Sequence, residues 1–166
     1  MERRADEEST VNVTTPVRAT RTYIQRLVAP PEDVFPLLCP VREVEWAHDW
    51  APTVVYSHSG VAEQDCVFVT PSEAGDEVWT ITRHDAEKWL VEMVMVAPTV
   101  VATRLTIQLR PSGDGCLADI CYHKTSLGPA GDEEVAQFTE AGWEAFMTTW
   151  ESEINDHLQK HAGQRR

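Results

Sequence analysis

Positive charge is scarce in this sequence. Among 166 residues, 14 Lys and Arg stand against 27 Asp and Glu, so the formal net charge is -13. A chain this acidic is repelled by phosphate backbones and by anionic lipid surfaces. The composition therefore argues against nucleic acid as a partner.

Long apolar runs are also missing. No window approaches the roughly 18 apolar residues of a membrane-spanning helix, and residues 1–15 lack the apolar core of a signal peptide. We expect a cytoplasmic protein with no membrane insertion. Its 42% hydrophobic content and lack of repeats or linkers predict one domain over residues 16–161. A disordered tail is expected over residues 1–15 and a short C-terminal tail over residues 162–166.

Few side chains have the spacing of a metal or nucleophile site. The four cysteines, Cys39, Cys66, Cys116 and Cys121, form no CxxC pair and are expected to be free thiols. No HxH, HExxH or GxSxG occurs, so we expect no metal and no cofactor. Cys39, close to Arg42, is the one thiol whose surroundings favour reactivity, and it is a minor candidate.

Alternating β-branched and aromatic runs dominate the chain. A strand is expected near residues 17–28, followed by a short helix that begins near Pro31 and is limited by Pro36 and Pro40. Six further strands separated by short turns predict an antiparallel meander. They are expected at residues 53–59, 66–70, 77–84, 88–96, 100–110 and 116–126.

The chain closes with an amphipathic pattern over residues 131–161 that predicts one long helix. Its apolar face is expected to hold Val135, Gly142, Trp143, Phe146, Trp150 and Ile154. The predicted fold is α+β, a seven-stranded antiparallel sheet curled around this C-terminal helix, with a short helical segment after the first strand.

This element order resembles the START-like, or SRPBCC, superfamily, which includes birch-pollen-type allergens, lipid-transfer START domains and polyketide cyclases. The resemblance covers residues 17–160. The segments that carry it are APPEDVFPLL, LLCPVREVEW, YSHSGVAEQDCVF, VWTITRHD and FTEAGWEAFMTTWE. It is most similar to bacterial single-domain members of the superfamily. The resemblance implies a helix-grip fold with a deep apolar pocket between sheet and helix.

Polyketide cyclases of this superfamily place polar groups in that pocket, which makes His58, Glu92, His123 and Glu153 candidate acid/base residues. Strand parity leaves two registers for residues 116–125. Either Ala118, Ile120 and Tyr122 face inward, or Asp119, Cys121 and His123 do. The apolar count favours the first, and similar alternation turns Glu92 outward.

The predicted ligand contacts are mostly aromatic or apolar, with a few polar groups. They are Trp46, Trp50, Tyr56, His58, Trp79, Met93, Met95, Leu105, Ile107, Tyr122, Gly142, Phe146 and Trp150. Gly142 either leaves room for a ligand or permits close contact of helix and sheet.

Residues 37–50, LLCPVREVEWAHDW, gather charged and aromatic side chains in a segment broken by proline. We interpret the segment as a lid over the cavity rather than a catalytic centre. Trp46 and Trp50 are expected to pack on the rim. Arg42 is expected to pair with Glu43 or Glu45.

The leading functional hypothesis is binding of a small apolar or aromatic molecule, for transport, sensing or sequestration. The alternative is a metal-independent lyase of the cyclase, aromatase or dehydratase type. A third hypothesis is a protein-partner or quinone-chaperone-like role, and a homodimer stays open.

Overall fold

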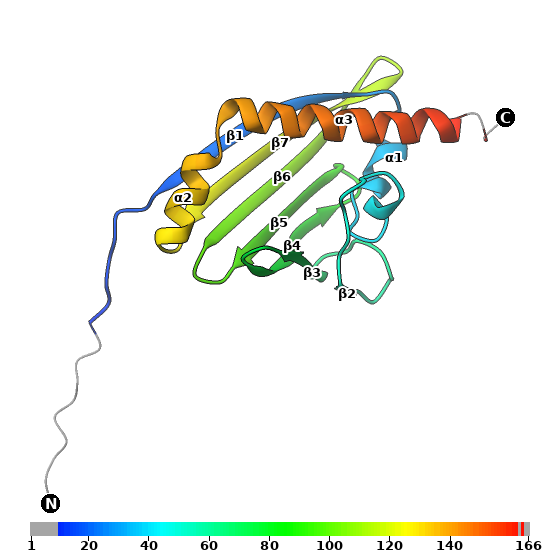
Figure 1. Ribbon diagram of the computed structural model, residues 1–166. Coiled ribbons are helices and arrows are strands. Elements are labelled where there is room, and N and C mark those ends of the chain that lie inside the picture. Colours follow the sequence, from blue (N-terminus) through cyan, green and yellow to red (C-terminus); the bar gives the residue numbers. More distant parts are fainter. Residues whose placement is uncertain (1–9, 163, 165–166) are drawn as a thin grey trace, which may run out of the picture.

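The computed structural model describes residues 10–162 and 164, and it folds as one antiparallel sheet crossed by a long helix (Figure 1). The strand order is β1-β7-β6-β5-β4-β3-β2. The strands are β1 (Arg18–Leu27), β2 (Val54–Tyr56), β3 (Val67–Ser72), β4 (Gly75–Asp85), β5 (Leu90–Ala97), β6 (Val101–Ser112) and β7 (Gly115–Ser126). The helices are α1 (Pro31–Val34), η1 (Phe35–Leu37), η2 (Glu43–Glu45), α2 (Pro129–Gln137) and α3 (Glu140–Ala162). The tails predicted over residues 1–15 and 162–166 lie partly outside the described residues.

The seven predicted strands all form, and the predicted fold class is confirmed. Period-two burial is clearest on β6, where alternate residues from Val101 to Leu109 are buried. Its neighbour β7 buries Ala118 and Ile120 on the same face. The favoured register of residues 116–125 is therefore confirmed. Alternate side chains of a strand point to the same face of the sheet, so Ala118 and Ile120 together face the core.

Helix α3 lies across one face of the sheet beside β1 (Figure 1). It buries Trp143, Met147, Ile154 and Leu158, which recur at helical spacing. The buried Gln25 side chain on β1 donates to the Met147 carbonyl at 3.1 Å and fixes the helix to that strand. Two positions of the predicted apolar face, Gly142 and Phe146, are not buried against the sheet, since Gly142 is exposed and Phe146 is 51% exposed, and both border the space beneath the helix.

The prediction of one closing helix was wrong, because the chain breaks at Phe138 and Thr139 into α2 and α3. The Thr139 hydroxyl accepts the Gly142 N–H at 3.2 Å, as a residue that begins a helix does. The Phe138 ring packs edge-on against Trp143 with 5.6 Å between centroids. The break lets α2 fold back on β7, while α3 crosses the sheet (Figure 1).

The segment between η1 and β2 is irregular, as the prolines predict, but two of its backbone hydrogen bonds have the i to i−4 spacing of an α-helix. The Glu43 N–H donates to the Cys39 carbonyl and the Ala47 N–H to the Glu43 carbonyl, both at 2.8 Å. These bonds place Cys39, Glu43 and Ala47 on one side of the segment, which faces the core. The segment therefore contributes a wall to the space beneath α3.

Candidate ligand-binding cavity

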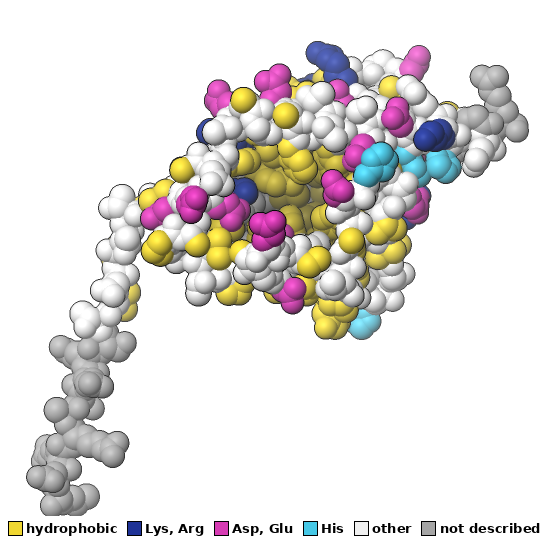
Figure 2. Space-filling view, in the orientation of Figure 1, with side chains coloured by type: hydrophobic (Ala, Val, Ile, Leu, Met, Phe, Trp, Pro, Cys, Tyr) yellow, Lys and Arg dark blue, Asp and Glu magenta, His cyan; other side chains and the backbone are white. Residues whose placement is uncertain are grey.

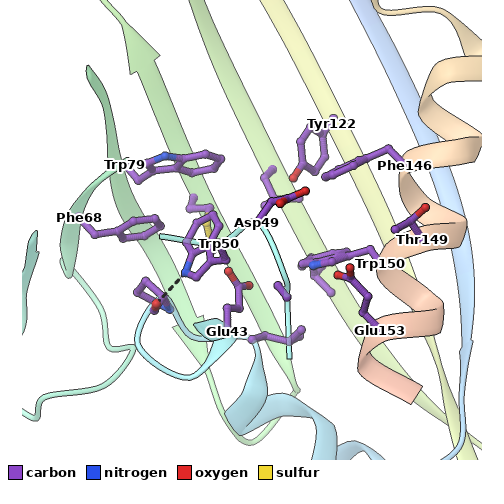
Figure 3. Close-up of a pocket in the computed structure, with 16 residues that line it drawn as sticks. Glu43, Asp49, Trp50, Phe68, Trp79, Tyr122, Phe146, Thr149, Trp150 and Glu153 are labelled. Atoms are coloured by element: carbon purple, nitrogen blue, oxygen red, sulfur yellow. Dashed lines mark hydrogen bonds between the residues drawn. The ribbon is translucent and has the colours of Figure 1, made fainter. Parts of the chain in front are cut away.

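A cavity of about 200 Å³ opens between the sheet, α3 and residues 38–50. Figure 2 shows it as a hollow beneath α3 with a hydrophobic interior and acidic side chains near its rim. Its lining is drawn in Figure 3. The lining residues are Leu38, Pro40, Glu43, Ala47, Asp49, Trp50, Phe68, Trp79, Met93, Leu105, Ile107, Tyr122, Phe146, Thr149, Trp150 and Glu153.

Aromatic rings form two sides of this cavity. On the sheet side, Phe68 and Trp79 stack with their centroids 5.5 Å apart, and Trp50 meets Phe68 edge-on at 5.8 Å. On the helix side, Phe146 and Trp150 stack with 6.4 Å between centroids. Offset and edge-on contacts of this kind are the favourable arrangements of aromatic pairs. A flat ligand between the two sides would meet ring surfaces on both.

The polar atoms of the sheet-side indoles are already engaged within the protein. Trp50 Nε1 donates to the Pro40 carbonyl at 2.7 Å, and Trp79 Nε1 donates to the Thr70 hydroxyl at 2.9 Å. Because a buried indole N–H needs an acceptor, these bonds fix the rings in place. The rings therefore offer the cavity hydrophobic surface without unmet donors.

A second compartment of about 450 Å³ adjoins the first and shares Trp50, Trp79, Tyr122 and Phe146 with it. Lys124 and Glu134 in this compartment form an ion pair at 3.0 Å. Thr103 is 2% exposed, and its hydroxyl has no hydrogen-bond partner among the described residues. The second compartment is thus more polar than the first.

The polar groups of the first compartment are mostly acidic. Glu43 is 9% exposed, and burial raises the pKa of its carboxyl to about 8. Burial also raises the pKa of the Tyr122 phenol, and the negative charges of Glu43 and Glu77 add to this effect. The Glu43 carboxyl points into the space between Trp50 and Trp150 (Figure 3). No hydrogen bond or ion pair reaches this carboxyl from residues 10–162 or 164.

Two further acids lie at the edge of the compartment. Glu153 Oε1 is 3.1 Å from His48 Nδ1, and the Glu153 side chain is 17% exposed while that of His48 is 82% exposed. Asp49 is exposed and also lines the cavity. Together with Glu43, they give the compartment three carboxyl groups.

Glu43 was missed as a cavity residue by the sequence analysis, which treated it as a partner of Arg42. The structure gives that role to Glu45, whose carboxylate accepts from Arg42 Nε at 2.9 Å. A signal was present in the sequence, since Cys39, Glu43, Ala47 and Trp50 recur at helical spacing. Pro36 and Pro40 concealed this spacing, because prolines argue against a regular helix.

Ten predicted ligand contacts line the two compartments. Trp50, Trp79, Met93, Leu105, Ile107, Tyr122, Phe146 and Trp150 line the first, and Met95 and Gly142 line the second. A Cβ on Gly142 would meet only the Thr139 hydroxyl, at 3.2 Å, so close contact with the sheet does not explain this glycine, and room for a ligand stays a prediction.

The structure places three other predicted contacts outside the lining. Tyr56 is 63% exposed on the short edge strand β2. His58 follows it in an exposed loop, where its N–H and that of Ser59 bind the Glu63 carboxylate. Trp46 is 3% exposed, donates from Nε1 to the Leu37 carbonyl at 3.1 Å and packs behind Trp150. Trp46 is therefore a core residue rather than a rim residue.

Of the four candidate acid/base residues, the structure brings only Glu153 to the cavity. His58 lies in the loop described above. Glu92 accepts from the Thr82 hydroxyl at 3.1 Å on the outer face of the sheet, and His123 Nδ1 lies 2.6 Å from the Thr20 hydroxyl. Strand alternation turns both away from the cavity, because Met93 and Tyr122 beside them face inward.

Metal binding and thiol chemistry gain no support from the geometry. Among the residues that the structure describes, no three His, Cys, Asp or Glu side chains gather to hold a metal ion. Cys39 is 2% exposed, and its sulfur accepts the Ala62 N–H at 3.0 Å, so the thiol is enclosed. Among residues 10–162 and 164, no helix is both long and apolar enough to cross a membrane.

Comparison with known proteins finds no matching family model and no matching curated protein. Solved structures do match. Norcoclaurine synthase from Thalictrum flavum is 13% identical with a TM-score of 0.65, over 93% of this chain and 100% of that one. The allergen Ara h 8.0201 is 12% identical with a TM-score of 0.57, over 83% of this chain and 98% of that one. CalU16 from Micromonospora echinospora is 15% identical with a TM-score of 0.54, over 84% of this chain and 82% of that one.

At these identities the matches show the fold, and they agree with the resemblance drawn from the sequence. The chain has the helix-grip fold of the START-like and birch-pollen-allergen-like proteins.

Proposed function

We propose that this protein binds a small aromatic molecule in the cavity beneath α3. The observation that carries the proposal is the pair of ring surfaces, Phe68 with Trp79 and Phe146 with Trp150, on opposite sides of one hollow. Ligand cavities in proteins are mostly apolar with a few placed polar groups, and this cavity has that composition. An open cavity also favours ligand binding over a role that depends on a protein partner alone.

The proposal is tested by native mass spectrometry of protein purified without detergent, followed by extraction and identification of bound molecules. We expect an aromatic compound, or uptake of one when the purified protein is offered a mixture. Thr149→Trp should prevent uptake, because Thr149 lines the cavity from an exposed position on α3, where a larger side chain fits the fold.

Ser152→Trp is the matched control, since Ser152 is exposed on the same helix and does not line the cavity. It should leave uptake unchanged. Equal uptake by the Thr149→Trp protein, or no uptake of any aromatic compound by the unaltered protein, would refute the proposal.

A second candidate function, acid/base catalysis on the bound molecule, is favoured by one observation. Glu43 combines burial with a pKa of about 8, which suits proton transfer near neutral pH, and Tyr122 lines the same compartment. Products released from a bound substrate, and lost in Glu43→Gln, would distinguish an enzyme from a carrier. An unchanged ligand recovered after long incubation would support binding alone.

A further inference from the structure

We propose that the cavity selects aromatic amines, whose protonated nitrogen pairs with the carboxylate of Glu43. This inference rests on the proposed function and names the chemical class of its ligand.

The first step is the isolation of Glu43. The residue is 9% exposed, its carboxyl faces the cavity, and no donor among the described residues reaches it. Burial of a carboxyl without a hydrogen-bond partner is costly, and native proteins rarely leave such a group unpaired. The Glu43 oxygens, unlike the Thr103 hydroxyl, are not fully enclosed, so they are open to a donor that enters the cavity.

The second step is the sign of the charge around it. Glu43, Asp49 and Glu153 line the first compartment, and its lining includes no Lys, Arg or His. Lys124 lies in the second compartment, where Glu134 already holds it. His48 reaches Glu153 from the exposed side. This arrangement attracts a cation and repels a carboxylate or phosphate ligand.

The third step is the aromatic lining. The faces of Trp rings attract cations within about 6 Å of the ring centre, and Trp50 and Trp150 both line the compartment that Glu43 faces. An aromatic amine therefore matches two features at once. Its ring fits between the ring surfaces, and its ammonium group meets Glu43 and the indoles. A neutral alcohol would supply one hydrogen bond but no charge.

The test compares three probes that share one ring and differ in charge, namely phenethylamine, phenethyl alcohol and phenylacetate. Binding is measured by calorimetry above the Glu43 pKa of about 8. We expect the amine to bind at least about tenfold more tightly than the alcohol, since a charge-assisted hydrogen bond is about twice as strong as a neutral one. Phenylacetate should bind most weakly.

Glu43→Gln keeps the size of the side chain and removes its charge. The amine should lose at least about tenfold in affinity in this variant, while the alcohol should change by less than about twofold. Glu87→Gln is the matched control, because Glu87 is exposed in the turn between β4 and β5 and the same charge is removed there. Thermal melting of both variants shows whether they are folded.

The pH dependence gives an independent signature. Below the Glu43 pKa, amine affinity should fall by about tenfold per pH unit in the unaltered protein, because only the ionised carboxylate binds the cation. Asp49, Tyr122, Glu153 and His48 also face this site or its edge, and all four persist in Glu43→Gln. The difference between the two proteins therefore isolates Glu43.

Each outcome bears on one proposal or on both. Equal binding of amine and alcohol, no effect of Glu43→Gln, or tightest binding of phenylacetate would overturn the amine inference and leave aromatic binding intact. If none of the three probes binds, the proposed function is overturned together with the inference. Preference for the amine that disappears in Glu43→Gln, with the alcohol unaffected, supports both.

Discussion

The indole of Trp46 packs against that of Trp150, with 5.3 Å between their centroids and 41° between their planes. This contact joins the segment of residues 38–50 to α3 at the back of the cavity. Trp150 faces the ligand space, and Trp46 supports it from the core. Trp46 can thus affect the cavity without touching a ligand.

Trp46→Ala should destabilise the fold by about 3 to 5 kcal/mol, because it removes a buried ring and leaves a void. This revises the expectation that Trp46 packs on the rim. Trp46→Phe keeps a ring and loses the bond to the Leu37 carbonyl, so it should cost less, about 1 to 3 kcal/mol. Urea denaturation measures both. A loss below about 1 kcal/mol for Trp46→Ala would show that the indole is not part of the core.

Thr103→Val should leave stability unchanged or raise it by about 1 kcal/mol. The Thr103 hydroxyl is buried without a partner among the described residues, and an unsatisfied buried hydroxyl costs about 1 to 3 kcal/mol. Valine has nearly the same shape. Denaturation with and without a bound ligand is the measurement. A clear loss of stability for the ligand-free variant would mean that a water molecule or other group satisfies the hydroxyl.

The sheet was predictable because each of its long strands buries one face. Apolar and polar residues therefore alternate along the strand, and this alternation also fixes how neighbouring strands pair. In β5, Val91, Met93 and Met95 are buried in turn, and their spacing is visible in the sequence. The turn between β6 and β7 contains Gly113 at a φ of 58°, a conformation that glycine adopts without strain. Local chemistry and tertiary packing favour the same structure in these elements.

The break between α2 and α3 and the position of Glu43 depended on tertiary contacts. Apolar periodicity continues across Thr139, whereas in the structure the Thr139 hydroxyl caps α3 and Phe138 packs against Trp143 at the break. Glu43 faces the core because the helical hydrogen bonds of its segment turn it to that side, and the sheet and α3 enclose it there. Sequence rules place charged residues outside, so a buried carboxyl at a functional site is the kind of residue that they miss.

The lid interpretation of residues 38–50 stays a prediction, and the contact between His48 and Glu153 offers a test of it. If the segment opens to release ligand, His48→Ala should speed ligand dissociation by about 1.4- to fivefold, since an exposed contact of this kind contributes about 0.2 to 1 kcal/mol. His58→Ala is the control, because that exposed histidine lies outside the lining. Stopped-flow measurement of tryptophan fluorescence follows release. Identical dissociation rates in both variants would argue against opening at this contact.

Glu43 should make the protein less stable as pH rises. Its pKa is about 8 in the folded state against 4.5 for an ordinary glutamate, so the folded state binds more protons between these values. Stability therefore falls as pH increases from 4.5 to about 8 and does not change further above that range on account of this group. Because one pKa unit corresponds to about 1.4 kcal/mol, the loss is on the order of 5 kcal/mol.

Glu43→Gln should abolish this loss and give the more stable protein at alkaline pH, while Glu87→Gln should follow the unaltered protein. Urea denaturation of the three proteins across this pH range, without ligand, measures the effect. A parallel pH dependence in Glu43→Gln would show that the carboxyl finds a partner or solvent in the folded state. A bound amine should reverse the trend in the unaltered protein alone, because the ion pair holds Glu43 in its charged form.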